Sequence, residues 1–201
     1  LSIRRQRQMC IRDRNLRVTR DFVEKWHYSR NVNGLTISQI FGLFYEKNLI
    51  GAMIYGSLAM ANQWKKYAEE ESKVVELKRL CCIDKTPKNT ESYFIGKTLR
   101  WMKQNSDYDL VVSYADTYYG HEGTIYKASN FKHMGLTTKG KVIDYNERYY
   151  HDKCIRTYYI NKDGEKVIKP FAQKIKGALE TGEAKYVEMP EKHIYIYSLT
   201  G

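Results

Sequence analysis

The chain has 201 residues, 42% of them hydrophobic, and its 34 Lys and Arg against 23 Asp and Glu give a formal net charge of +11. This length is enough for one domain with a sizeable core, and the absence of an apolar run of about 18 residues argues against a transmembrane helix. The charge permits a polyanionic partner such as DNA but does not require one.

The first stretch, residues 1–14, contains the string RRQRQMCIRD, which resembles the in-frame translation of a transposase-based sequencing adapter. We therefore interpret it as an artefact that lies outside the fold. Its five arginines and one aspartate contribute +4, so the charge of residues 15–201 falls to +7. We interpret residues 15–201 as a single domain.

Hydrophobic periodicity predicts alternating helices and strands, which indicates an α/β fold. Helices are predicted at residues 19–28, 90–104, from 124 onward and at 171–179; strands are predicted at 40–44, 49–55, 74–83, 109–115, 135–145, 156–160 and 194–199. Thr19 and Thr90 are expected to cap the first two helices.

The segment at residues 113–131, SYADTYYGHEGTIYKASNF, follows the apolar run 110–112, which is typical of a strand buried on both faces. Asp116 stands where this strand should end, and Gly120 and Gly123 then indicate a turn before a helix. Ligands of open α/β sheets bind beyond the carboxyl ends of the strands. Asp116 is therefore either a site residue or the cap of the following turn.

Arg79 is the single charge on one phase of the predicted strand 74–83, a phase it shares with apolar residues. An inward guanidinium needs an acid or a ligand, because an unpaired buried charge is very costly. Asp116 is the natural partner if the two strands are neighbours, either in a functional site or in a structural ion pair. His27 and Tyr28 are candidate acid–base groups, although a lone helix histidine is more often structural.

The start of the predicted helix at 90–104 offers free amide groups to an anion such as a pyrophosphate. Four residues surround it: Lys88, Asn89, Thr90 and Ser92. The chain has neither a G-x-G-x-x-G motif nor a P-loop. No metal site is predicted, because the adjacent Cys81 and Cys82 should point to opposite faces of a strand and the cysteines lack metal-binding spacing. Reduced cysteines are typical of a cytosolic protein.

Six strings across about residues 27–131 resemble, in order and spacing, the Mom family of bacteriophage DNA-modification proteins. They are FVEKWHYS, IFGLFYEKNLIGAMIYG, ELKRLCC, PKNTESYFIGKTLRWMK, VVSYAD and GHEGTIYKASNF. The family is similar to the GNAT acyltransferase fold, which implies a mixed, centrally splayed β-sheet flanked by helices. The splayed strands would be 74–83 and 109–115, with the cofactor between them. Core motifs are placed in residues 19–138, and residues 139–201 are interpreted as a lineage-specific part.

The resemblance implies an enzyme that transfers a carbamoylmethyl-like group to the exocyclic amino group of adenine in DNA and so protects that DNA from restriction. It implies a phage or prophage protein that acts in the cytoplasm of a bacterial host, with no membrane partner. The functional positions that it implies are His27, Tyr28, Arg79, Asp116 and Tyr126. An acyl-CoA cofactor is implied by the fold and iron by the family, but the loop at 85–92 lacks the glycine-rich pyrophosphate signature, so the donor is left open.

Two alternatives of other classes remain at this point. One is a small-molecule or protein N-acyltransferase on the same fold, because a fold does not fix a function. The other is a non-catalytic DNA-binding protein, which would show a salt-dependent affinity and no modified base.

Overall fold

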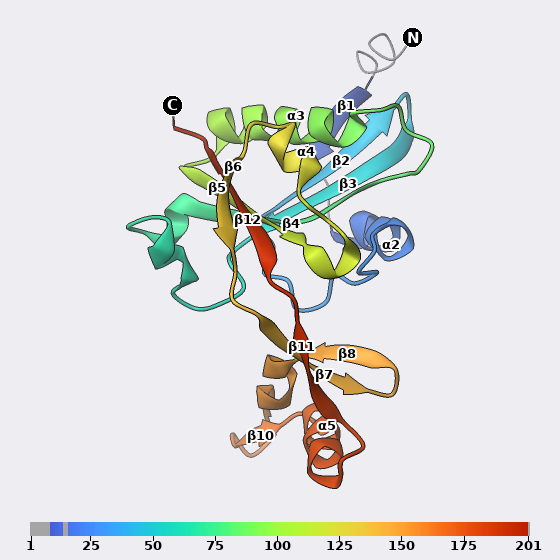
Figure 1. Ribbon diagram of the computed structural model, residues 1–201, viewed down its shortest axis with the longest axis vertical. Coiled ribbons are helices and arrows are strands. Elements are labelled where there is room, and N and C mark those ends of the chain that lie inside the picture. The colour runs from blue at the N-terminus through green and yellow to red at the C-terminus, as the bar shows by residue number, and fades with distance from the viewer. Residues whose placement is uncertain (1–8, 14–15, 201) are drawn as a thin grey trace. The chain divides into compact units, whose positions relative to one another are not determined.

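The computed structural model describes residues 9–13 and 16–200 and divides into two compact units (Figure 1). Unit 1 runs to Asp116 and adds His121–Gly135 and the end of the chain from His193. Unit 2 consists of Thr117–Gly120 and Leu136–Lys192. Among the described residues, no helix is long and apolar enough to cross a membrane.

Unit 1 is built on a seven-stranded sheet with the order β1-β2-β3-β4-β5-β12-β6. Its strands are β1 (Met9–Asp13), β2 (Gln39–Tyr45), β3 (Asn48–Gly56), β4 (Val74–Cys82), β5 (Leu110–Asp116), β6 (Lys132–Leu136) and β12 (Lys192–Ser198). The pairs from β1 to β4 are antiparallel and β4 pairs with β5 in parallel, so the sheet is mixed. Short 3-10 helices occur at Gln63–Lys66, Glu71–Lys73 and, in unit 2, at Thr117–Tyr119 (η3) and Asp152–Arg156 (η4).

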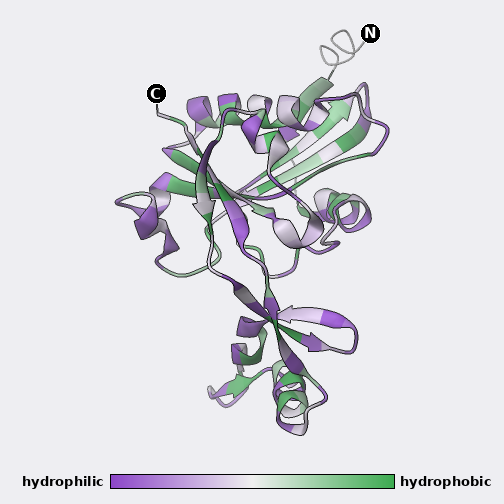
Figure 2. Cartoon of the chain, viewed as in Figure 1, coloured by the Kyte–Doolittle hydropathy of each residue, from purple (hydrophilic) through white to green (hydrophobic). Residues whose placement is uncertain are grey.

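Helices cover both faces of this sheet. On one face, α2 (Leu16–Trp26) packs Val23 against Ala52 and Ile54 of β3. On the other face, α3 (Thr90–Asn105) and α4 (Thr124–Lys127) pack in a larger cluster that includes Met53 and Tyr55. Successive residues of β3 thus face opposite helices, which explains why the strand is almost continuously hydrophobic (Figure 2). The predicted α/β class, with helices flanking a mixed sheet, is confirmed.

The two predicted caps are wrong. The first helix begins at Leu16, so Thr19 is a buried residue inside α2 rather than its cap. The second helix follows Asn89, which has a left-handed conformation with φ of 67°, and Thr90 is already its first residue. The Thr90 hydroxyl instead donates to the Pro87 carbonyl oxygen at 2.7 Å.

The sheet separates at its centre. The parallel pairing of β4 with β5 extends only from Val74 opposite Leu110 to Leu77 opposite Ser113. The Ser113 hydroxyl donates to the Leu77 carbonyl oxygen at 3.2 Å, at the last paired position. Beyond it, β4 continues to Cys82 and β5 to Asp116 without further pairing between them. The predicted central splay is therefore present between the two predicted strands.

A β-bulge interrupts β4 just beyond this point. Tyr55 of β3 pairs with Leu77 and Ile54 pairs with Arg79, so Lys78 is an extra residue in β4. An extra residue shifts the alternation of every side chain that follows it. Arg79 therefore lies on the α2 face with Ile54 and does not share the face of Leu77, so the prediction that Leu77 and Arg79 share one phase of the strand is wrong.

Gly123 fixes the approach to α4. Its φ is 73°, and a Cβ added there would lie 2.2 Å from the Tyr195 ring. The Tyr195 hydroxyl donates to the Glu122 carbonyl oxygen at 2.6 Å. Glycine is required here because only glycine combines this left-handed backbone with so close a ring.

Unit 2 has its own small core. A three-stranded sheet has the order β11-β7-β8, and Ile143 of β7 packs in a buried cluster with Ile175 and Ala178 of α5. Its elements are β7 (Gly140–Tyr145), β8 (Arg148–His151), β9 (Tyr158–Ile160), β10 (Lys166–Ile168), α5 (Pro170–Thr181) and β11 (Lys185–Met189). The placement of residues 15–201 in one domain, with 139–201 as a lineage-specific part, stays a prediction.

β1 belongs to the stretch that we interpret as adapter translation. In the structure it pairs antiparallel with β2, and the Met9 side chain is buried. The rest of that stretch, residues 1–8 and 14, lies outside the described residues. The interpretation of residues 1–14 as an artefact remains a prediction that a deletion tests.

Candidate functional site

Side chains from three separate parts of unit 1 meet beside the end of α2. The ring centroids of His27 and Tyr28 are 4.2 Å apart, and those of Tyr28 and His121 are 5.0 Å apart. Arg79 reaches the same place from β4, where its Nε donates to the Asn31 carbonyl oxygen at 3.1 Å. Three of the predicted site residues, His27, Tyr28 and Arg79, are thus brought together across about fifty residues of sequence.

His27 is held as a neutral imidazole. Its side chain is buried, and its Nδ1 accepts a hydrogen bond from the Ser29 amide at 3.0 Å. Burial lowers the pKa of His27 to about 3, and the electrostatic effects of Arg79 and then His121 add to this lowering. Because Nδ1 is an acceptor, the neutral ring carries its hydrogen on Nε2. At neutral pH this residue is a hydrogen-bond donor rather than a strong base.

Arg79 is held by main-chain carbonyl groups. Its Nη1 donates to the Lys78 carbonyl oxygen at 2.7 Å, in addition to the bond to Asn31. Burial lowers the pKa of Arg79, and the nearby Tyr28 and Glu76 oppose that shift. An arginine remains charged at neutral pH even so, which places a fixed cation next to His27.

The described contacts of the Arg79 guanidinium are with main-chain carbonyl oxygens, and the contact expected between Arg79 and Asp116 stays a prediction. Asp116 is the last residue of β5 and is buried, and its carbonyl oxygen accepts from the His121 amide at 3.2 Å. The main chain at Asp116 is thus tied to the histidine whose ring contacts Tyr28.

Tyr126 belongs to a different set of contacts. It is buried on the α3 face of the sheet, with its ring centroid 5.5 Å from Phe131 and 5.3 Å from Tyr195. Burial raises the pKa of Tyr126, a hydrogen bond with Ser113 opposes this, and the charge of Glu76 adds to it. Tyr126 is therefore a protonated phenol beneath the splay.

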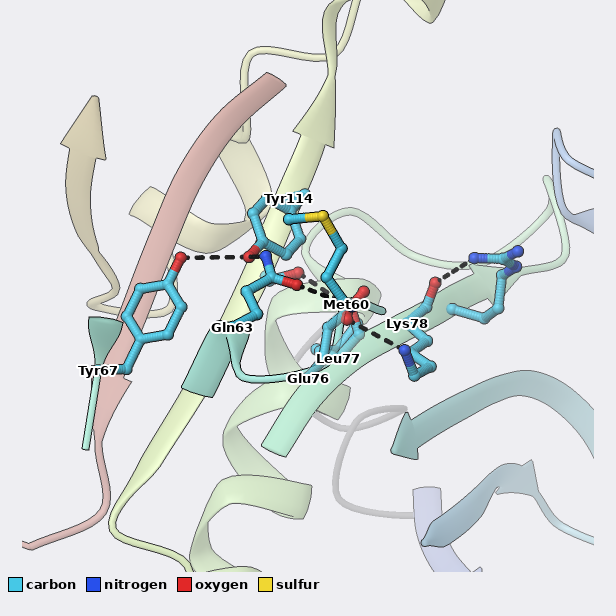
Figure 3. A network of polar contacts seen from close by, with 9 residues as sticks. Met60, Gln63, Tyr67, Glu76, Leu77, Lys78 and Tyr114 are labelled. Atoms are coloured by element: carbon cyan, nitrogen blue, oxygen red, sulfur yellow. Dashed lines mark hydrogen bonds and ion pairs between the residues drawn. The ribbon is translucent and has the colours of Figure 1, made fainter. Parts of the chain in front are cut away.

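A buried ion pair occupies the splay itself. Lys78 Nζ donates to Glu76 Oε2 at 3.0 Å, and the two side chains are only 5% and 13% exposed (Figure 3). The charge of Glu76 contributes to the raised pKa values of Tyr114 and Tyr126, after the larger effect of burial. The carboxylate of Glu76 thus lies close to both phenols.

Tyr114 connects the splay to the segment that follows β3. Its hydroxyl accepts from Gln63 Nε2 at 2.7 Å and lies 3.2 Å from the Tyr67 hydroxyl (Figure 3). Gln63 is fixed in turn by the Met60 amide, which donates to its Oε1 at 3.2 Å. Six polar side chains, Gln63, Tyr67, Glu76, Lys78, Ser113 and Tyr114, therefore gather where β4 and β5 part.

Comparison with known proteins decides the family. The Mom protein family matches residues 8–201. The chain belongs to the Mom family. It is 27% identical over 139 residues to the methylcarbamoylase Mom of Escherichia phage Mu, which covers 67% of this chain and 56% of that protein. The chain thus spans little more than half of the length of this curated relative.

Solved structures similar to this Mom-family chain are acetyltransferases. An Arabidopsis thaliana NAA60 structure in complex with acetyl-CoA has a TM-score of 0.53 at 11% identity, covering 96% of this chain and 99% of that one. The spermidine N-acetyltransferase SpeG of Vibrio cholerae also has a TM-score of 0.53, at 10% identity, covering 96% and 95% of the two chains. At this identity the likeness shows the fold alone, and it confirms the predicted GNAT-like architecture.

At the start of α3, the hydroxyl groups of two of the four predicted cofactor-binding residues donate to nearby main-chain carbonyl groups. The hydroxyl of Ser92 donates to the Asn89 carbonyl oxygen at 3.1 Å, as that of Thr90 does to Pro87. The Thr90 amide also donates to the Pro87 carbonyl oxygen, and Glu91 places an acid in the first turn. An acid here disfavours an anion. The assignment of Lys88, Asn89, Thr90 and Ser92 to a cofactor stays a prediction.

An iron site would need several His, Cys, Asp or Glu side chains that converge on one point. Among the described residues, no group of three or more His, Cys, Asp and Glu side chains is arranged to hold a metal ion. Cys81 packs in the α2 cluster and Cys82 against the α3 cluster, on opposite faces as predicted. Because no set of described side chains fits iron, the proposed reaction assigns no role to a metal ion.

Sequence reasoning missed the splay network and the position of His121. Glu76 and Lys78 are two opposite charges two residues apart on a strand that lies between other strands, and this was a usable signal for a buried ion pair. Tyr114 and Gln63 lie about fifty residues apart, so no local pattern could predict their hydrogen bond.

Proposed function

We propose that the chain modifies DNA by transferring a small, carbamoylmethyl-like group to the exocyclic amino group of adenine. The observation that carries this proposal is the convergence of His27, Tyr28 and Arg79 beside the chain segment that follows Asp116, in a chain of the Mom family. These are positions that the family resemblance marks as functional: His27 and Tyr28 directly follow α2, and Arg79 belongs to β4.

The chemistry requires a proton acceptor and a place for an extruded base. The adenine amino group is a weak nucleophile and is paired in a duplex, so the base must leave the stack before reaction. In the proposal, the amino nitrogen attacks the donor carbon, the leaving group departs, and Asp116 takes the proton from nitrogen. The low pKa of His27 supports this choice of base, because its Nδ1 is engaged by Ser29 and it stays neutral.

The other residues hold the reacting groups. Tyr28, whose side chain is 45% exposed, offers a ring on which adenine can stack. His27 donates from Nε2, and Arg79 supplies a fixed positive charge that favours an anionic leaving group or phosphate. Tyr126, a protonated phenol below the splay, is a proton donor rather than a base in this scheme.

The donor is left open between acyl-CoA and another carrier. The fold places an opening between β4 and β5, and one structural neighbour was solved in complex with acetyl-CoA. Two features oppose a coenzyme A pyrophosphate at α3: the Thr90 amide is engaged by Pro87, and Glu91 is in the first turn. A small-molecule or protein N-acyltransferase is therefore the weaker proposal, and non-catalytic DNA binding would not require the cluster of His27, Tyr28 and Arg79.

The decisive experiment is mass spectrometry of nucleosides from DNA of bacterial cells that express the chain. We expect a modified adenosine from the parent and a fall of about two or more orders of magnitude for Asp116→Asn, with DNA affinity nearly unchanged. Asp107→Asn is the matched control, because it makes the same chemical change at an exposed residue. Only ordinary nucleosides from the parent, together with acetyl transfer to free amines, would favour the N-acyltransferase instead.

A further inference from the structure

Exposed apolar side chains are concentrated in unit 2. Of the fourteen large hydrophobic residues that are exposed among those described, nine belong to this unit. They are Tyr118, Tyr119, Leu136, Tyr149, Tyr158, Tyr159, Ile160, Phe171 and Tyr186. Unit 2 also carries twelve Lys and Arg against nine Asp and Glu, so this apolar surface lies on a net positive unit.

The helix α5 packs on one face of the three-stranded sheet of unit 2, and the exposed ring of Tyr149 lies on the other face. Ile143 and Tyr150, paired across β7 and β8, both contact the cluster that contains α5. Their neighbours Asp144 and Tyr149 are also paired, and they point to the opposite face because side chains alternate along a strand. Lys185 of β11 pairs with Asp144 and joins the same row.

Three tyrosines gather on this opposite face. The ring centroids of Tyr118 and Tyr119 are 5.1 Å apart and those of Tyr118 and Tyr149 are 6.2 Å apart, both in edge-to-face arrangements. A hydrogen bond with Tyr118 raises the pKa of Tyr149, so the phenol stays neutral at physiological pH. Each of the three residues is 46–50% exposed. We call this set, Tyr118, Tyr119 and Tyr149, the tyrosine platform.

Chain connectivity limits the distance between the Cα of Tyr118 and that of the proposed base. Thr117 donates its hydroxyl to the Glu191 carbonyl oxygen at 2.5 Å, which fixes η3 within unit 2. Tyr118 follows Asp116 by two residues, and consecutive Cα atoms are about 3.8 Å apart, so the two Cα atoms lie within about 7.6 Å of each other in any arrangement of the chain.

We propose that the tyrosine platform is a binding surface for unpaired nucleobases of the DNA substrate. This inference rests on the proposed function, which requires an adenine outside the base stack. It goes further by naming the surface that binds other unpaired bases of the same DNA strand. Aromatic rings on an uncovered antiparallel sheet face are a general means of stacking single-stranded bases. Lys185, in the same row, and the net positive charge of unit 2 attract the DNA phosphates. Asp144 lies between Lys185 and Tyr149 in this row, and its carboxylate disfavours a phosphate directly over the rings.

The test separates bases from phosphates. A single-stranded oligonucleotide and an abasic oligonucleotide of the same length carry the same backbone charge, so only the first can stack. We expect the parent chain to prefer the oligonucleotide with bases, and replacement of all three platform tyrosines by Ala to remove that preference. Each ring that stacks on a base should account for about 5- to 150-fold in affinity.

Two variants control this experiment. Replacement of the same three residues by Phe keeps the rings and should retain the preference for bases. Alanine at Tyr158, Tyr159 and Phe171, three other exposed rings of unit 2, should leave it unchanged. The dependence of affinity on salt should be equal in all variants, because the phosphate contacts are the same. Circular dichroism melting confirms that each variant is folded.

Several results would overturn the inference. They are equal affinity of the parent for both oligonucleotides, a Phe variant that loses as much as the Ala variant, and a control variant that loses the preference too. A change in sedimentation on Ala substitution with unchanged DNA affinity would identify an interface between two copies instead. If the parent modifies adenine but binds both oligonucleotides with equal affinity, the role of the tyrosine platform is refuted and the proposed function is retained.

Discussion

The ion pair in the splay makes a quantitative prediction about stability. At the observed 3.0 Å between Lys78 Nζ and Glu76 Oε2, Coulomb's law with an effective dielectric constant of about 20 gives about 5.5 kcal/mol of attraction. Most of this offsets the cost of removing both charges from water, so the pair adds little net stability. Glu76→Gln, however, leaves the Lys78 ammonium buried without its counter-charge, and we expect a loss of about 3–5 kcal/mol in the free energy of unfolding.

Urea denaturation followed by tryptophan fluorescence measures this loss in unit 1. The three tryptophans of the chain, Trp26, Trp64 and Trp101, all belong to that unit, so their emission is not affected by a separate transition of unit 2. Glu24→Gln is the matched control. It removes a carboxylate 4.0 Å from Arg20 on α2, where both side chains are 41% exposed, and should change the unfolding free energy by about 0–0.5 kcal/mol.

A double variant completes the cycle. Glu76→Gln combined with Lys78→Met removes both charges at similar volume, so most of the stability lost in the single variant should return. A single variant no less stable than the Glu24→Gln control would show that water reaches the pair. A double variant with the summed losses of the two single variants would show that the two residues act independently. Either result would refute the reasoning from burial and distance.

Two further predictions concern the rest of unit 1. The pKa of His27 is about 3 when folded and near 6.5 when unfolded, so the unfolded chain binds more protons between these values and stability falls as pH drops from about 6.5 toward 3. As the pH is lowered from 6 to 4, the unfolding free energy of the parent should decrease faster than that of His27→Asn, by about 1.4 kcal/mol per pH unit. Equal decreases in the two proteins would contradict this. Deletion of residues 1–14 tests the adapter interpretation, which predicts an unchanged unfolding free energy of unit 1. A large loss in urea denaturation would show that Met9–Asp13, which pairs with β2, belongs to the fold.

Much of unit 1 is readable from sequence because its elements are long and periodic. The strands β2, β3, β4 and β5 and the helix α3 lie within one or two residues of their predicted bounds. The strands of unit 2 were harder to predict from the sequence, since β8, β9 and β10 have only three or four residues each. β11 pairs with β7 across about forty residues, and a pairing at that separation leaves no local pattern.

The residues of the site were predicted better than their contacts. His27, Tyr28 and Arg79 were found from family strings and do meet, whereas the face of Arg79 was deduced from strict strand alternation. That deduction failed at one residue, because Arg79 does not share the face of Leu77. Nothing in the local sequence ELKRLCC marks Lys78 as an extra residue, because the bulge is defined by how Ile54 and Tyr55 pair across the sheet.

The same bulge explains how one short run of β4 serves two polar centres. In a regular strand, Glu76, Lys78 and Leu80 would share one face and Arg79 would share the other with Leu77. With Lys78 as the extra residue, Leu80 joins Leu77 in the α3 cluster, while Arg79 extends toward Asn31 and His27 at the end of α2. Lys78 remains with Glu76 at the point where β4 leaves β5. The bulge therefore directs Arg79 toward the His27 cluster and leaves Lys78 paired with Glu76 where β4 parts from β5. A regular strand would not separate the two cations in this way.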